Sequence, residues 1–266
     1  MILDRLAETA RERVAAQKKL LPLAELRAAA EALPRAADFP FARALERPGL
    51  SFVCEVKRAS PSKGVIAEHF PHLDIARAYA EAGADAVSVL TEPSAFLGSD
   101  EHLRDIAAAV PLPVLRKDFT VDEYQIYEAK VLGAAAVLLI VALLPRARLR
   151  EFLETARALG LSALVEAHTE GEIGDALAAG AKIVGVNNRD LRSFAVDLSL
   201  SERLGGHIPK TCVFVAESGV SSPEDAARLA RAGADAVLLG EAIMRAADKR
   251  AFLRSLKEGA AREDAR

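Results

Sequence analysis

The feature that most constrains this chain is a segment that recurs along it. Residues 82–90 (AGADAVSVL) return as residues 232–240 (AGADAVLLG), and weaker copies begin at Leu132, Leu159 and Ala179. In most copies a glycine follows a helical pattern and precedes a short apolar run, so it suits the left-handed residue that ends a helix. The apolar runs lack alternation with polar residues, which indicates strands that are buried on both faces, as in a parallel sheet.

Completing the pattern predicts eight strands, each followed by enough chain for a helix and short loops. The expected strands are residues 51–57, 85–91, 113–118, 136–141, 162–167, 182–187, 212–217 and 235–239. Helical periodicity lies between them, for example over residues 73–81, 124–131 and 146–158. Even spacing of eight units predicts an α/β fold closed as a (β/α)8 TIM barrel, with an open doubly wound sheet as the alternative.

Residues 1–47 do not follow the repeat. They contain an amphipathic helical pattern from Ile2 to Val14 and a second one from Leu20 to Leu33. We expect a single barrel domain over residues 1–266, with residues 1–47 as an amino-terminal helical extension, because about 45 residues make a poor independent core. We further expect the barrel to fold without this extension, whose apolar face would form a wall of the site.

Composition excludes several classes of protein. Apolar residues make up 51% of the chain, which argues against disorder, and 35 Lys and Arg against 38 Asp and Glu leave a net charge of −3. A nucleic-acid-binding protein usually has a basic excess, so no nucleic-acid partner is expected. The two cysteines, Cys54 and Cys212, lie far apart and form no metal-binding motif.

The sequence also carries no sign of a membrane or export segment. The amino terminus is charged from Asp4 onward, unlike a secretory signal. The most apolar stretch, residues 131–144, is too short to cross a bilayer and is typical of a buried helix end followed by a buried strand. We therefore expect a cytoplasmic protein without a membrane partner.

Polar residues gather where the expected strands end. In the first strand, alternation puts Glu55 and Lys57 on the face opposite to Phe52 and Cys54, so the charged pair points into the barrel. Inward charges are costly unless they are paired or functional, and a structural ion pair is the alternative. Four later strands end near further polar side chains: Lys117; Glu166 and His168; Asn187 and Arg189; Glu217 and Ser218.

The active site of this fold forms at the carboxyl ends of the strands, so these side chains are candidates for chemistry. Chance surface charge would explain one such residue but not the whole set. Gly219 and Gly240 follow the last two strands, where loops and a helix amino terminus commonly bind phosphate. Tight turns are the alternative for these glycines. His168 is expected to be a loop residue and not a metal ligand.

These motifs together resemble the indole-3-glycerol-phosphate synthase family of tryptophan biosynthesis. The resemblance rests on Glu55–Gly64 (EVKRASPSKG), Leu90–Ser99 (LTEPSAFLGS), Arg116–Phe119 (RKDF), 138–141 (LLIV), Val165–His168 (VEAH), Gly185–Asp190 (GVNNRD) and Ala216–Gly219 (AESG). It implies ring closure, with decarboxylation and dehydration, of 1-(2-carboxyphenylamino)-1-deoxyribulose 5-phosphate. It also implies that no cofactor and no metal are needed.

The resemblance implies roles for individual residues. Lys117 would protonate the ketone oxygen, Glu166 and Lys57 would serve as acid and base in the loss of the hydroxyl group, and which lysine acts in which step stays open. The catalytic set is Lys117, Glu166, Lys57, Glu55, Asn187 and Ser218. The binding set is Ser60, Lys63, Phe96, Phe119, Leu139, Arg189, Glu217, Gly219, Gly240 and Glu241, the last through its backbone N–H with its side chain turned away. Phe96, Phe119 and Leu139 would hold the aromatic ring.

Two alternatives remain from the sequence. Another phosphosugar barrel, an isomerase or aldolase, would share the phosphate site but gives no reason for the aromatic residues beside Glu55 and Lys57. A non-catalytic barrel subunit would be expected to lose the inward polar residues, and they are present. The expected partner is a small phosphosugar-anthranilate molecule, and the choice between monomer and homodimer is left open.

Overall fold

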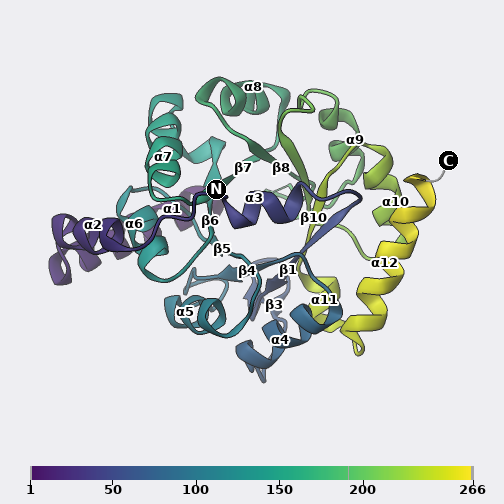
Figure 1. Ribbon diagram of the computed structural model, residues 1–266, viewed down its shortest axis with the longest axis horizontal. Helices are drawn as coiled ribbons and strands as arrows, with labels where there is room; N and C mark the ends of the chain where they lie inside the picture. The colour runs from purple at the N-terminus through teal and green to yellow at the C-terminus, as the bar shows by residue number, and fades with distance from the viewer. Residues whose placement is uncertain (1, 191, 265–266) are drawn as a thin grey trace.

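The barrel is closed. The computed structural model describes residues 2–190 and 192–264, and in this part eight parallel strands pair in a ring in which β1 meets β10, with Ser51 opposite Ala236. The expected (β/α)8 barrel is thereby confirmed and the open sheet is excluded. Figure 1 shows the helices arranged around this ring.

The strands agree with the predicted ranges to within one residue at either end. They are β1 (Ser51–Val56), β4 (Ala86–Leu90), β5 (Val114–Lys117), β6 (Ala136–Ile140), β7 (Ser162–Ala167), β8 (Ile183–Asn187), β9 (Val213–Glu217) and β10 (Ala236–Leu239). A short hairpin of β2 (Ala59–Ser60) and β3 (Gly64–Val65) follows β1.

The helices that follow the strands cover the outside of the ring. They are α4 (His72–Ala82), α5 (Asp100–Ala109), α6 (Tyr124–Val131), α7 (Arg146–Ala158), α8 (Glu170–Ala179), α9 (Ser199–Gly205), α10 (Pro223–Arg231), α11 (Glu241–Arg245) and α12 (Lys249–Asp264), with a 3₁₀ turn η1 (Val141–Leu143) after β6. The repeat glycines end helices as expected: Gly83 after α4 has φ 88° and Gly180 after α8 has φ 102°.

Each strand contributes to two apolar layers. On β1, Phe52, Cys54 and Val56 pack in the layer between strands and helices, whereas Val53 packs inside the barrel. Side chains alternate across a strand, so this arrangement turns Glu55 and Lys57 toward the barrel interior. The charged pair therefore lies at the end of the inner core, as the alternation predicted.

The amino-terminal extension forms three helices, α1 (Ile2–Leu20), α2 (Leu23–Ala32) and α3 (Pro40–Leu45). The expectation of a helix from Leu20 to Leu33 is wrong at its start: α1 continues through Leu20, and α2 begins at Leu23. Pro22 separates them because proline has no N–H to donate and disfavours a helical residue before it. In Figure 1, α2 projects from the edge of the molecule beside α6.

Helix α3 belongs to the barrel core. Phe41 and Leu45 are completely buried in the inner apolar layer. Ser51 Oγ donates to the carbonyl of Ala44 at 3.2 Å, and Ser162 Oγ accepts from the backbone of Ala42 at 3.3 Å, so α3 lies across the amino ends of β1 and β7. Part of residues 1–47, helix α3, therefore fills the end of the barrel at which the strands begin, and this packing argues against folding of the barrel without the extension.

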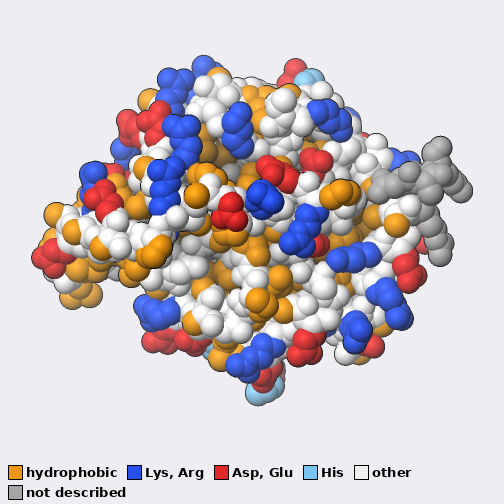
Figure 2. Space-filling view, viewed as in Figure 1, with side chains coloured by type: hydrophobic (Ala, Val, Ile, Leu, Met, Phe, Trp, Pro, Cys, Tyr) orange, Lys and Arg blue, Asp and Glu red, His pale blue; other side chains and the backbone are white. Residues whose placement is uncertain are grey.

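The surface on the α3 side carries both signs of charge. Figure 2 shows blue and red side chains interspersed over the peripheral helices of this face. Within the described residues, no helix is both long enough and apolar enough to cross a membrane.

Candidate active site

A cavity of about 680 Å³ opens at the carboxyl ends of the strands. This volume falls in the range of small-molecule sites, roughly 300–1,000 Å³. Its wall includes Ile2, Leu3 and Leu6 of α1. The extension therefore reaches both ends of the barrel, with α1 where the strands end and α3 where they begin.

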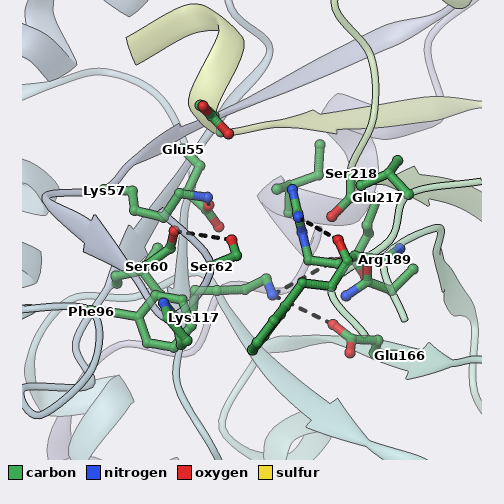
Figure 3. A pocket seen from close by; sticks show the side chains of 18 of the residues that line it. Glu55, Lys57, Ser60, Ser62, Phe96, Lys117, Glu166, Arg189, Glu217 and Ser218 are labelled. Atoms are coloured by element: carbon green, nitrogen blue, oxygen red, sulfur yellow. Dashed lines mark hydrogen bonds and ion pairs between the residues drawn. The ribbon is translucent and has the colours of Figure 1, made fainter. Parts of the chain in front are cut away.

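The structure brings nearly all the predicted site residues to this cavity. Those that line it are Glu55, Lys57, Ser60, Lys63, Phe96, Lys117, Phe119, Glu166, Asn187, Arg189, Glu217, Ser218, Gly219, Gly240 and Glu241. Figure 3 shows ten of the lining side chains, labelled, converging from separate strands and loops.

Leu139 is the exception, because it does not line the cavity. Its side chain is completely buried in the outer layer against the helices, and its neighbours Leu138 and Ile140 line the cavity instead. Residues 136–140 are all apolar, so the sequence of β6 gives no polar residue from which to tell the inner face from the outer one.

The end of β1 holds a tightly bonded charged pair. Lys57 Nζ donates to Glu55 Oε1 at 2.6 Å, and Ser88 Oγ of β4 donates to Glu55 Oε2 at 3.3 Å. Glu55 is buried and Lys57 is largely so. Both oxygens of Glu55 are thus occupied, which fixes the position of the Lys57 ammonium at the cavity wall.

Lys117 reaches from the end of β5 to two carboxylates on the far side of the cavity. Its Nζ lies 3.4 Å from Glu166 Oε2 on β7 and 3.5 Å from Glu217 Oε2 on β9. Figure 3 shows Lys117 pointing across the open centre toward Glu166. The side chain of Asn187 on β8 also lowers the pKa of Glu166. One molecule bound in the cavity would therefore lie beside both the Lys117 ammonium and the Glu166 carboxylate.

Burial and these contacts shift the pKa values of Lys117, Glu166 and Glu217. Burial would lower the pKa of Lys117, but the carboxylates of Glu217 and Glu166 outweigh it and raise the pKa. Burial would raise the pKa of Glu166, but Lys117 and His168 lower it below the usual range. Burial and the charge of Glu166 raise the pKa of Glu217 to about 8. Two neighbouring carboxyl groups with pKa values pushed apart are the arrangement that suits acid–base work.

The apolar end of the cavity carries two aromatic rings. The centroids of Phe96 and Phe119 are 6.2 Å apart. Sequence reasoning missed the residue that fixes Phe96. The buried Glu92 accepts from the backbone N–H groups of Ser94 at 2.9 Å, Ala95 at 2.8 Å and Phe96 at 3.1 Å. Glu92 stands in the quoted motif, but its bonding depends on a loop geometry that spacing does not reveal.

Sequence reasoning also missed the residues behind Lys117. The next residue, Asp118, is buried and accepts from Arg13 Nη2 of α1 and from Thr91 Oγ1, both at 2.6 Å. Burial would raise the pKa of Asp118, but Arg13 and Arg116 lower it. Since Arg13 lies 105 positions away in the chain, no local pattern signals the pair.

The opposite end of the cavity consists of loops with exposed backbone. Ser218 and Gly219 after β9 both have positive φ, 66° and 97°. The side chain of Asn188 donates to the carbonyl of Ser218 at 3.1 Å and supports this turn. Glu241 was expected to turn its side chain away; its carboxylate instead lies 3.8 Å from Lys63 Nζ at the mouth, besides bonding to Arg245 at 3.1 Å.

Two glycines leave room for charged side chains. A Cβ added to Gly240 would lie 2.4 Å from Lys57 Nζ and 2.8 Å from Glu55 Oε1. A Cβ added to Gly185 would lie 2.3 Å from Glu217 Oε1. The lack of a side chain at Gly240 and Gly185 thus leaves space for the side chains of the cavity.

Among the described residues, no group of three or more His, Cys, Asp and Glu side chains is arranged to hold a metal ion.

Solved structures resemble the chain in fold. The 3-hexulose-6-phosphate synthase of Salmonella typhimurium has a TM-score of 0.66 at 15% identity, over 80% of this chain and all of that one. A second 3-hexulose-6-phosphate synthase has a TM-score of 0.63 at 19% identity, over 79% of this chain and 99% of the other. At this identity the likeness concerns the barrel alone.

Sequence relatives are much more similar. The model of the family described as indole-3-glycerol phosphate synthase matches residues 3–256. The indole-3-glycerol phosphate synthase of Ruminiclostridium cellulolyticum is 50% identical over 98% of this chain and 100% of its own length. Indole-3-glycerol phosphate synthase 2 of Streptomyces coelicolor is 49% identical over 96% of this chain and 98% of its own. Because the family model and these relatives span nearly the whole chain, the protein belongs to the indole-3-glycerol phosphate synthase family.

Proposed function

We propose that the cavity performs the ring closure of the family on 1-(2-carboxyphenylamino)-1-deoxyribulose 5-phosphate, with the residues of this chain in the roles given below. The products are indole-3-glycerol phosphate, CO₂ and water. The observation that carries the proposal is the Lys117 ammonium at the cavity centre, held between Glu166 and Glu217.

Lys117 serves as the acid of the ring closure. The ring carbon that bears the carboxylate attacks the ketone, and the ketone oxygen needs a proton as the new bond forms. The raised pKa of Lys117 keeps its ammonium charged at neutral pH, as a proton donor requires. Loss of CO₂ from the same ring carbon then restores the aromatic system.

Dehydration follows at the carbon that carried the ketone. The hydroxyl group leaves as water after it takes a proton from an acid, while a base removes a proton from the substrate. Glu166 is ionised, because its pKa is lowered, and suits the base. Lys57, bonded to Glu55 at 2.6 Å, suits the acid.

The remaining residues bind the two ends of the substrate. Phe96 and Phe119, with Leu138 and Ile140 in place of Leu139, would hold the aromatic ring. The phosphate would lie at the opposite end of the cavity, among its backbone N–H groups, hydroxyls and charged side chains. Its neighbours would be Ser60, Lys63, Arg189, Gly219, Gly240 and Glu241, while Asn187 and Ser218 would bind substrate hydroxyls. The proposed partner is this small molecule, and the proposed location is the cytoplasm.

The test is an assay of the purified protein with this substrate, following the absorbance or fluorescence of the indole product. We expect turnover in the wild type and a loss of more than about 10²–10⁴-fold in Lys117→Ala, the usual effect of one general acid, because Lys117 also contacts the substrate. Lys182→Ala, an exposed lysine before β8 at the other end of the barrel, is the control. A wild type without product would overturn the activity, and wild-type turnover in Lys117→Ala would remove that residue from the mechanism.

A further inference from the structure

A histidine lies beside the oxygen of Glu166 that Lys117 does not face. His168 follows β7, its side chain is 18% exposed, and its Nε2 lies 3.6 Å from Glu166 Oε1. Lys117 faces the other oxygen, Oε2, at 3.4 Å. Among the described residues this buried Nε2 has no hydrogen-bond partner. A buried polar atom without a partner requires an explanation, and catalysis is one of the recognised ones.

The other edge of the imidazole is fixed by α8. His168 Nδ1 lies 3.7 Å from Glu172 Oε2, and the same oxygen accepts the backbone N–H of His168 at 2.6 Å. Glu172 is itself held at the start of the helix, where its backbone donates to the side chain of the N-cap residue Thr169. Glu172, His168 and Glu166 thus form a carboxylate–imidazole–carboxylate chain that ends at the cavity.

The charges around this chain favour an imidazolium. Burial would lower the pKa of His168, but Glu172 on α8, Glu166 on β7 and Glu217 on β9 outweigh it and raise the pKa. The pKa of Glu172 is lowered, because its bonds to His168 outweigh burial. Glu166 therefore has the Lys117 ammonium beside one oxygen and, beside the other, an imidazole whose protonated form is favoured by its surroundings.

We propose that His168 is a positioning residue for Glu166, held in place by Glu172, which keeps the Glu166 carboxylate ionised and oriented while Lys117 gives up its proton. The inference rests on the proposed function of Glu166 as the base. When the Lys117 ammonium transfers a proton to the ketone oxygen, it becomes a neutral amine and no longer stabilises the carboxylate. His168 supplies a positive charge that persists through this step.

The kinetic test is the pH dependence of kcat in His168→Asn. Without the imidazolium the pKa of Glu166 rises, so activity that needs the carboxylate is lost at a higher pH. An opposite charge at this distance shifts a carboxyl pKa by about one unit or more, so we expect the acid limb of kcat to move up by about one pH unit. The plateau of kcat should fall several-fold with KM little changed, because His168 does not line the cavity.

Two further variants frame the result. Glu172→Gln should move the acid limb in the same direction but less, because it leaves His168 in place. His207→Asn is the matched control, since His207 forms an exposed pair with Glu170 of the same helix, 3.4 Å apart, away from the cavity. An active His168→Asn whose acid limb coincides with that of His207→Asn would overturn the inference.

A second measurement does not depend on the folding of His168→Asn or on turnover. Nuclear magnetic resonance titration of the imidazole in the wild type and in Glu166→Gln should show a lower pKa for His168 in the variant. An unchanged titration would overturn the inference even in an active enzyme. A wild type that makes no product but shows the expected titration would overturn the proposed function and leave the coupling of the two side chains intact.

Discussion

Gly240 contributes to the site through the side chain that it lacks. Gly240 was interpreted from sequence as part of a phosphate loop, where its backbone N–H is the functional group. The structure adds a second requirement, because a Cβ at this position would lie 2.4 Å from Lys57 Nζ. The added Cβ would also lie 2.8 Å from Glu55 Oε1, so the space occupied by both members of the charged pair depends on this glycine.

The variant Gly240→Ala separates these two requirements. Alanine keeps the backbone N–H, so a role limited to phosphate would leave kcat unchanged. We expect kcat to fall by roughly 10²-fold, an effect comparable to weakening one acid–base group, because Lys57 must move from its seat beside Glu55. The free energy of unfolding should change little, since the displaced atom is the end of a flexible side chain.

The measurement is steady-state kinetics with urea unfolding, and the control is Gly174→Ala in α8, where an added Cβ meets no atom within 4 Å. Equal kcat values for the two variants would contradict the proposal that Lys57 needs the space beside Gly240.

Residues such as Leu139 and His168 show where sequence reasoning stopped. The ends of most strands could be predicted, because short apolar runs followed by polar residues mark them in the sequence. The inward face of β6 could not, since an all-apolar strand carries no alternation. Two partners were also missed: Glu172 of His168 lies beyond a helix start, and Arg13 lies 105 positions before Asp118.

At the scale of elements, the extension divides into parts with different positions. Helix α1 lines the cavity mouth and is anchored to the end of β5 through Arg13 and Asp118. Helix α2 lies against α6, where Arg27 is 5.8 Å from the ring centre of Tyr127. Helix α3 closes the lower end of the barrel. The sequence predicted helices here and an apolar face of the extension at the wall of the site, where Leu3 and Leu6 of α1 lie. It did not predict the positions of α2 and α3, because amphipathicity reveals an apolar face without naming its partner.

The place of α3 predicts a large effect of Phe41→Ala. Phe41 is completely buried inside the barrel, and removal of such a ring costs about 3–5 kcal/mol of unfolding free energy. Leu33→Ala is the control, because Leu33 is 41% exposed and should stay within about 0.5 kcal/mol of the wild type. Deleting residues 1–45 should likewise destabilise the protein more than deleting residues 1–34, which spares α3. Denaturant unfolding measures all four, and a cost for Phe41→Ala no larger than for Leu33→Ala would contradict the role of α3.

At the scale of the whole molecule, the proposed phosphate site draws on both ends of the barrel sequence. Ser60 follows the first strand of the barrel, whereas Gly219 and Gly240 follow the last two. A ligand there binds only the folded form, because unfolding separates these segments. Binding of such a ligand should therefore raise the free energy of unfolding.

Inorganic phosphate is expected to raise the melting temperature and to compete with substrate. Ligand at 100 times its dissociation constant adds about 2.7 kcal/mol to the free energy of unfolding. Differential scanning fluorimetry in phosphate and in chloride of equal ionic strength tests this. Equal melting temperatures in the two salts would argue against a phosphate site in these loops.

The pairing of β1 with β10 has a consequence for how the chain matures. The ribosome delivers Ser51 long before Ala236, the residue opposite which it comes to lie. Until then the first strand is an exposed edge with unpaired backbone groups, the kind of edge that recruits other chains. Phe41 and Leu45 likewise stay exposed at first, because β7 and the later strands that bury them are synthesised afterwards. The nascent polypeptide thus keeps this edge exposed until its last strand has been made, and completion of the ring covers its beginning.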